Sequence, residues 1–161
     1  MQDFVHLHVH TQYSLLDGQA SVARLVDKAM KNGMKGIAVT DHGNMFGIKE
    51  FTNYVNKKNS GPKGEIKDLK KRIAGIEAGT VECEDKEAEI AACKAKIVEA
   101  ENKLFKPIIG CEMYVARRTM DLKEGKPDQS GYHLIVLAKN EKGYHNLIKL
   151  VSHAWTRGYY M

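Results

Sequence analysis

A run of alternating apolar and histidine residues near the start of the chain constrains the fold most strongly. The run covers residues 4–10, where Val5, Leu7 and Val9 alternate with His6, His8 and His10. Alternation with a period of two predicts a β-strand that carries the three imidazoles on one face. Side chains two positions apart on a strand lie about 6–7 Å from each other, which suits rings that share a metal cluster. Ordinary core packing explains this face poorly, because each buried ring needs hydrogen-bond partners, and a hydrated strand face is the alternative.

Length and composition restrict the remaining choices. The 161 residues suit one domain with a real core, and the formal charge of +5 is compatible with a phosphate-bearing partner without requiring one. The three cysteines show no CxxC spacing and cannot all pair, which favours a reduced setting. No signal peptide precedes the first predicted strand, and no apolar run reaches transmembrane length. We therefore expect a cytoplasmic protein without a membrane partner.

The segments that follow alternate between helix and strand patterns. Apolar residues at helical spacing predict a helix over residues 20–32, and the apolar run 36–40 predicts a buried strand. A second helix carries apolar residues at positions 48, 51 and 55. Two further buried strands, 108–116 and 132–138, precede a last helix that Asn140 caps and that turns Tyr144, Leu147, Ile148 and Val151 inward. This rhythm predicts an α/β fold with a parallel sheet.

The section from residue 57 to residue 105 has a different character. Residues 59–64 have the composition of a linker, and Lys and Glu dominate the residues that follow. Apolar residues recur at intervals of three and four over 66–76 and 90–104, on either side of Gly79. The pattern predicts a charged antiparallel helical hairpin, inserted at 57–105 between two parts of one domain, 1–56 and 106–161. A solvated spacer and a docking site for a protein partner are both compatible with it.

Imidazoles and carboxylates are expected at the ends of the predicted strands or in their interiors. The set has six members, His8, His10, Asp17, His42, Glu112 and His133. His10 and His42 follow apolar strands at their carboxyl ends, the face where parallel α/β barrels place their active sites. Such ligands suit a divalent cluster of zinc, manganese, iron or magnesium. Ions held there would lower the pKa of a bound water and neutralise phosphate oxygens, the two requirements of phosphoester hydrolysis.

Neighbouring residues have supporting roles in this interpretation, each with a plainer alternative. His6 lies about 13 Å from the last histidine of the strand and is placed deeper in the barrel or behind the ligands. Asp41 either orients a neighbouring imidazole or caps the next turn. Asp17, directly before a glycine, is otherwise a turn residue. Arg117 and Arg118 are candidates for contacts with a phosphate chain, although adjacent basic residues are usually only solvated.

Two motifs built from these residues resemble a known family. His8-Val9-His10-Thr11, followed by the segment 14–18, resembles the first motif of the polymerase and histidinol phosphatase (PHP) domain, and the segment 40–44 resembles its second. Residues 4–18, 40–47, 107–116 and 146–152 also resemble the N-terminal region of bacterial DNA polymerase III alpha subunits. The resemblance covers nearly all of the chain outside the section 57–105.

The resemblance implies a distorted (β/α)7-type PHP barrel, here interrupted by the helical hairpin, with a metal cluster at its strand ends. It assigns the role of metal ligand to the same six residues and strengthens His133, which lies near the start of its strand. The later motifs of the family fall beyond residue 161. We therefore expect an incomplete barrel with an exposed sheet edge, inactive on its own and without the catalytic aspartates of the polymerase.

Three functions follow from these expectations. The first is a metal-dependent phosphodiesterase that supports 3′→5′ exonuclease proofreading within a DNA-directed DNA polymerase of DNA replication. DNA would be reached through the full-length polymerase, other replicase subunits would be partners, and an activated water rather than a side chain would attack. The second is a structural, metal-stabilised module that braces the polymerase and docks a partner. The third is a freestanding PHP phosphatase for a small phosphomonoester, which the polymerase-like segments disfavour.

Overall fold

The structure, a computed structural model, describes residues 4–160 and divides the chain into two compact units. Unit 1 comprises Met1–Tyr54 and Lys106–Met161, and unit 2 comprises Val55–Phe105. The two units are described separately. Over the described range, none of the helices combines the length and the apolar character that crossing a bilayer requires.

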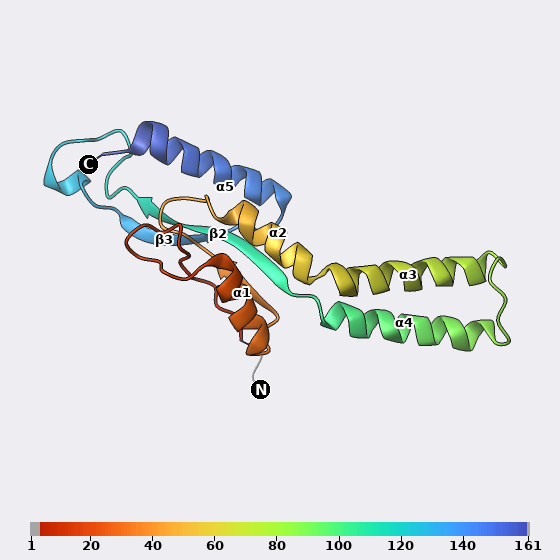
Figure 1. Cartoon of the computed structure of the whole chain (residues 1–161). Coiled ribbons are helices and arrows are strands. Elements are labelled where there is room, and N and C mark those ends of the chain that lie inside the picture. The colour runs from red at the N-terminus through yellow and green to blue at the C-terminus, as the bar shows by residue number, and fades with distance from the viewer. Residues whose placement is uncertain (1–3, 161) are drawn as a thin grey trace. The chain divides into compact units, whose positions relative to one another are not determined.

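A three-stranded sheet forms the centre of unit 1 (Figure 1). Strand β1 (Gly36–Val39) pairs in parallel with β2 (Lys106–Val115), and β2 pairs in antiparallel fashion with β3 (Tyr132–Leu137). The α/β prediction is confirmed, but the expectation of a wholly parallel sheet is wrong for β3. The connection between β2 and β3 carries the 3-10 turn η1 (Lys126–Asp128) instead of the crossover helix that a parallel return needs. A closed barrel would need more strands than these, so the barrel stays a prediction.

The extended segment 4–10 is not a strand of this sheet, so the prediction of a strand there is wrong. Two backbone bonds hold it there, each 2.9 Å long: Ala38 N of β1 donates to His6 O, and Thr40 N, directly after β1, donates to Val9 O. A ladder this sparse holds the segment beside β1 without completing regular strand pairing. The side-chain alternation still has its effect, because the rings of its second and third histidines are 4.9 Å apart.

Two helices of unit 1 begin at polar caps. Ser21 caps α1 (Val22–Lys31), and Asn140 caps α5 (Glu141–His153) by accepting a bond from Gly143 N at 2.9 Å. The predicted Asn140 cap is therefore confirmed. α2 (Ile48–Lys58) follows the loop after β1 and buries Phe51 in unit 1.

The last helix covers the sheet only in part. α5 lies along β2 and β3 on the side away from α1 (Figure 1), and its Leu147 is buried. Ile148, expected to point inward, is exposed instead, as are Tyr132 and Leu134 of β3. The expectation of a buried last strand is therefore wrong, because β3 is the outer strand of the sheet. After α5 the chain continues as the π-helical turn η2 (Ala154–Gly158).

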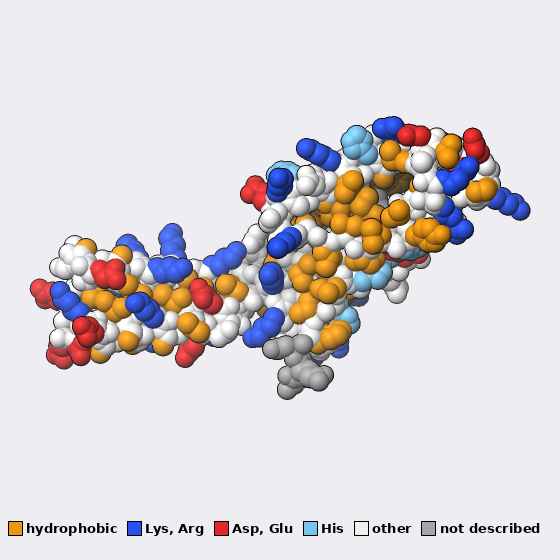
Figure 2. All heavy atoms as spheres, turned by 180° about the vertical axis from the view of Figure 1, so that it is seen from behind, with side chains coloured by type: hydrophobic (Ala, Val, Ile, Leu, Met, Phe, Trp, Pro, Cys, Tyr) orange, Lys and Arg blue, Asp and Glu red, His pale blue; other side chains and the backbone are white. Residues whose placement is uncertain are grey.

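Unit 2 contains the two helices α3 (Ser60–Glu77) and α4 (Lys86–Asn102), joined by the loop 78–85. The interpretation of residues 59–64 as a linker is wrong, because α3 begins at Ser60 and Pro62 stands in its first turn, where its missing N–H is not needed. The buried side chains include Ile76, Cys93 and Ala100, all from the predicted apolar runs. Figure 2 shows apolar side chains along these helices between charged ones of both signs.

Candidate metal centre

The six predicted ligand residues lie in one cluster of unit 1. They come from residues 8–17, from the chain just after β1, from β2 and from β3. Two triplets each bring one possible ligand atom per residue within 4.8 Å of the others, namely His8, His10 and Glu112, and His10, Asp17 and His42. The sixth residue joins through a contact of His133 Nδ1 with Glu112 Oε1. The structure thus places the six side chains together, and their role as metal ligands stays a prediction.

Glu112 is the hub of the cluster. A parallel β-bridge joins it to His42, so the pairing of β1 with β2 resumes at the site, where Gly43 N donates to Glu112 O at 2.8 Å. The side chain is only 7% exposed. Its Oε2 lies 2.7 Å from His10 Nε2 and 3.7 Å from His42 Nδ1, while Oε1 contacts His133. Three imidazoles therefore surround one buried carboxylate.

His10 Nε2 indicates that protons alone do not satisfy this cluster. Among the residues that the structure describes, it is the one buried side-chain nitrogen or oxygen without a hydrogen-bond partner. Glu112 Oε2 is close enough, at 2.7 Å, but an N–H on this nitrogen would not point at it. A close pair of ligand-type atoms with no proton directed between them fits a divalent cation bound beside both. Imidazole nitrogen and carboxylate oxygen are also ligands that zinc and manganese accept.

Thr40 determines which nitrogen of His8 is available to a metal. Its buried hydroxyl accepts a bond from Val9 N at 3.0 Å and donates one to Val9 O at 3.3 Å. The same hydroxyl is hydrogen-bonded to His8 Nδ1 at 2.8 Å, so this nitrogen is already occupied. Nε2 is therefore the nitrogen of His8 that is left for a cation. Sequence reasoning did not identify Thr40, although its place two residues before His42 was an available signal.

Asp41 shapes the loop that carries Asp17. Its carboxylate, 1% exposed, accepts bonds from Thr11 N at 2.6 Å, Thr11 Oγ1 at 2.9 Å and Ser14 Oγ at 3.0 Å. Ser14 Oγ in turn accepts a bond from His42 N at 2.8 Å. Asp41 therefore acts on the backbone around the ligands. Two roles were expected for Asp41, orienting a neighbouring imidazole or capping the next turn, and its bonds reach His42 only indirectly, through Ser14.

Tyr114 is a residue of the site that sequence reasoning did not find. It lies two positions after Glu112 on β2, and its ring centroid is 4.9 Å from that of His42 and 4.6 Å from that of His133. The hydroxyl contacts His42 Nε2. Burial raises the pKa of Tyr114, and the negative charges of Glu112 and Asp17 raise it further, so the phenol is neutral near pH 7. The spacing of two residues from Glu112 was the signal, because such residues share a strand face.

Three predicted supporting residues lie elsewhere. His6 is exposed and its ring packs edge-on against Phe4, with centroids 4.7 Å apart, so the expected place behind the ligands is wrong. Arg118 pairs with Asp128, and this hydrogen bond raises the pKa of the arginine and lowers that of the acid. A phosphate would have to compete with that pair. Arg117 is exposed and lies 5.3 Å above the centroid of a tyrosine ring of β3.

Comparison with known proteins agrees with this geometry. The sequence matches the PHP domain over residues 6–161. It is 40% identical over 160 residues to the DNA polymerase III subunit alpha of Borreliella burgdorferi and 39% identical over 158 residues to that of Treponema pallidum. The protein of the same name from Aquifex aeolicus is 33% identical over 165 residues.

These alignments cover 98%, 98% and 99% of this chain but only 10% of each relative. The chain therefore spans about a tenth of the length of the curated relatives it matches. The match to the PHP domain takes in nearly the whole sequence and confirms the resemblance of the motifs. The chain belongs to the PHP domain family.

Proposed function

We propose that unit 1 is a metal-dependent phosphodiesterase that removes nucleotides from the 3′ end of single-stranded DNA, as a proofreading site of a replicative DNA polymerase. The observation that carries this proposal is the gathering of six metal-competent side chains around the buried carboxylate of Glu112, with His10 Nε2 left unsatisfied. The similarity to DNA polymerase III alpha subunits supports DNA as the substrate, other replicase subunits as partners and a cytoplasmic location.

Divalent ions, when bound, would supply positive charge for the phosphate and a more acidic water. The residues of the chain prepare the site for that chemistry. Thr40 occupies Nδ1 of His8 and orients its ring, and Asp41 with Ser14 holds the loop of Asp17. Tyr114 keeps a neutral hydroxyl beside His42, where it can donate a hydrogen bond to a phosphate oxygen.

A structural role for the metal is the second candidate function. The segment 4–10 carries two of the ligands and is held beside β1 by sparse backbone bonding. A metal bound there would tie this segment to β1 and β2, and it would stabilise the fold without any reaction. The relatives that match are polymerase subunits, so we do not propose a freestanding phosphatase.

The experiment measures bound metal and cleavage on the same preparation of the natural protein that carries this chain. A single-stranded oligonucleotide labelled at its 5′ end is incubated with manganese or zinc. We expect stepwise shortening from the 3′ end, and we expect the H8A/H10A variant to lose both its metal and at least about 100-fold in cleavage rate. His145→Ala is the matched control, because His145 is exposed on α5 beside Glu141.

The outcomes separate the two candidates. Metal binding that raises the melting temperature without any cleavage would favour the structural role. A wild-type protein that binds no divalent metal would contradict both.

A further inference from the structure

Two stacked aromatic rings lie just after α5 and belong to none of the groups described so far. Trp155 lies in η2, and Tyr159 is the first residue after η2. Their ring centroids are 5.9 Å apart and their planes differ by 12°. Both side chains are largely exposed, Trp155 by 53% and Tyr159 by 63%. The described residues therefore leave a large flat aromatic surface open.

The indole nitrogen of Trp155 is hydrogen-bonded to the backbone next to the candidate metal centre. Nε1 donates to Gly43 O at 2.7 Å, and Gly43 N donates to Glu112 O at 2.8 Å. Gly43 directly follows His42 in the chain, so the backbone that carries a predicted ligand also holds the indole. The indole N–H, the polar group of the ring, is already satisfied. The exposed part of the ring is free to stack on another aromatic group.

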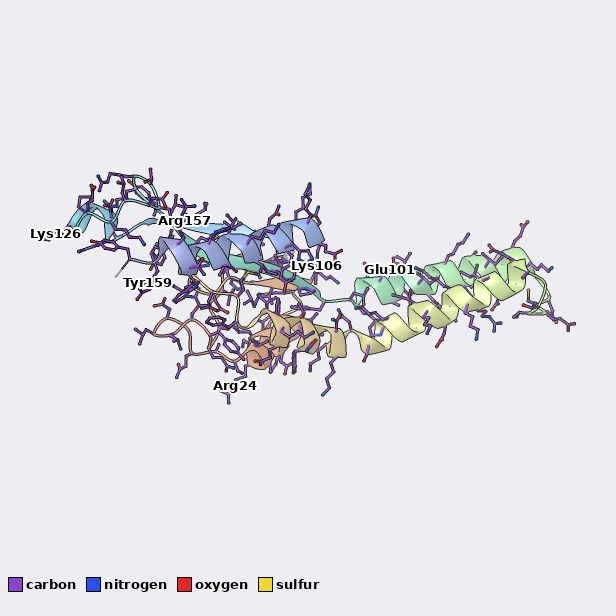
Figure 3. The ribbon with its side chains drawn as sticks, turned by 90° about the horizontal axis from the view of Figure 1, so that it is seen from above. Arg24, Glu101, Lys106, Lys126, Arg157 and Tyr159 are labelled. Carbon is purple, nitrogen blue, oxygen red and sulfur yellow. The ribbon has the colours of Figure 1, made fainter. Side chains whose placement is uncertain are left out.

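The loop between β2 and β3 fixes the chain around the two rings and brings positive charge to it. Arg157 donates to both carboxylate oxygens of Asp121, at 2.9 and 3.0 Å. Lys123 Nζ donates to Arg157 O at 3.0 Å, and Gly125 N donates to Tyr160 Oη at 3.1 Å. Figure 3 shows Arg157 together with Tyr159 at the end of α5. An ammonium group thus lies against the backbone of Arg157, which is midway in sequence between Trp155 and Tyr159.

We propose that Trp155 and Tyr159 form a stacking platform for an unpaired nucleobase of a single strand whose phosphodiester lies at the metal centre. The proposal rests on the proposed function for the position of that phosphodiester. Every base has an aromatic face, so such a platform binds single strands without regard to sequence, as removal of any 3′ nucleotide requires. The two rings already contact each other, so the base stacks on an outward face and not between them. Lys123 is placed to meet the charge of the backbone.

The fluorescence of the chain provides a direct test, because Trp155 is its single tryptophan. The chain is titrated with a short single-stranded oligonucleotide in the presence of a chelator, and in parallel with an abasic strand that has the same number of phosphates. We expect the normal strand to quench the indole and to bind roughly 5- to 100-fold more tightly than the abasic strand. Equal binding and equal quenching by both strands, or no response to either, would overturn the proposal and leave a protein partner as the occupant of the rings.

Variants assign the base preference to the rings themselves. With a fluorescein-labelled strand, the double variant W155A/Y159A should weaken binding of the normal strand by roughly 5- to 100-fold and leave the abasic strand unchanged. Trp155→Phe keeps an aromatic face and should keep most of the preference. Leu150→Ala removes a similarly exposed apolar side chain, 52% exposed, from α5 and is the matched control without effect.

The chelator makes this test independent of cleavage. Base-dependent binding, together with a natural protein that cleaves no DNA in the metal assay above, would contradict the proposed function and leave the platform standing. Cleavage by a protein that binds both strands equally would contradict the platform alone.

Discussion

The two units bury polar side chains in different ways, and the difference separates folding from binding. In unit 2 the buried amide of Asn59 uses both of its ends on one residue, donating to Phe105 O at 2.8 Å and accepting from Phe105 N at 2.9 Å. In unit 1 the buried polar groups include the acids Asp41 and Glu112. A neutral amide with both ends bonded needs nothing more, whereas a buried carboxylate among imidazoles needs positive charge. The buried amide of unit 2 is satisfied within the unit, whereas the acids and imidazoles of unit 1 form a candidate cation site.

The largest expected effect is that of Gly18→Ala in unit 1. A Cβ at Gly18 would lie 1.9 Å from Thr11 O, so the tight loop next to Asp17 cannot close around it. We expect a loss of about 4 kcal/mol in the free energy of unfolding, together with loss of bound metal. Urea denaturation and elemental analysis measure the two effects. A variant with normal stability would show that the close approach of this loop is not required.

Ile76→Ala should produce the next largest effect, in unit 2. Ile76 is fully buried, and truncation of such a side chain costs about 2–5 kcal/mol. Because no predicted ligand lies in unit 2, we expect the metal content and the DNA cleavage rate to remain those of the wild type. The exposed Val98 of α4 supplies the control, since Val98→Ala should change stability by less than about 0.5 kcal/mol. Loss of metal in the Ile76 variant would break the distinction between the units.

Addition of zinc or manganese should stabilise unit 1 alone. A ligand that binds only the folded state contributes about 2.7 kcal/mol when its concentration is 100 times its Kd. Hydrogen exchange read by mass spectrometry should therefore slow in β1 and β2 and stay unchanged in α3 and α4. Glu112→Gln removes the buried charge and should abolish the effect. Equal protection of both units would contradict the assignment of the cation to the cluster.

What could be predicted from the sequence follows the same division. The apolar residues of α3 and α4 were predictable because a helix pair depends on local periodicity, and Ile76 and Cys93 are buried as that periodicity requires. The six candidate ligands could be chosen by chemistry alone. The roles of Thr40 and Tyr114 could not, because they depend on contacts between residues far apart in the chain, His8 with Thr40 and His42 with Tyr114.

Errors in the predicted elements have similar causes. The direction of β3 depends on the connection before it, which carries a 3-10 turn where a parallel strand needs a crossover. The linker predicted at 59–64 is wrong because Gly and Pro, which usually interrupt helices, stand here in the first turns of a helix. Pro62 stands in the first turn of α3, where proline is tolerated.

Gly64→Ala is the counterpart of Gly18→Ala, with the opposite sign and a smaller effect. A Cβ at Gly64 would meet nothing within 4 Å, and Gly64 lies inside α3. Alanine in a helix is more stable than glycine by roughly 0.5–1 kcal/mol, because it loses less backbone entropy on folding. Urea denaturation should therefore show a gain in stability. A loss would mean that α3 contacts something at this position.

The smallest effect at neutral pH concerns the thiols. Burial raises the pKa of Cys111 in unit 1 to about 11, and the charges of Asp41 and Glu112 add to the shift. In an unfolded chain the pKa of a thiol is about 8.5. The contribution of Cys111 to the free energy of unfolding is therefore present below that pH and is lost as the pH rises to about 11. With a chelator present, Cys111→Ala should flatten the loss of stability in this range.

Alkylation compares this thiol with one in unit 2. Iodoacetamide near pH 8 should label Cys83, which is partly exposed, much faster than Cys111, because the thiolate is the reactive form and Cys111 stays protonated and buried. Peptide mass spectrometry identifies the labelled site. Equal rates would show that the region around Glu112 opens as readily as the loop of unit 2. The carboxylate of Glu112 would then be in contact with water and would not need a bound cation.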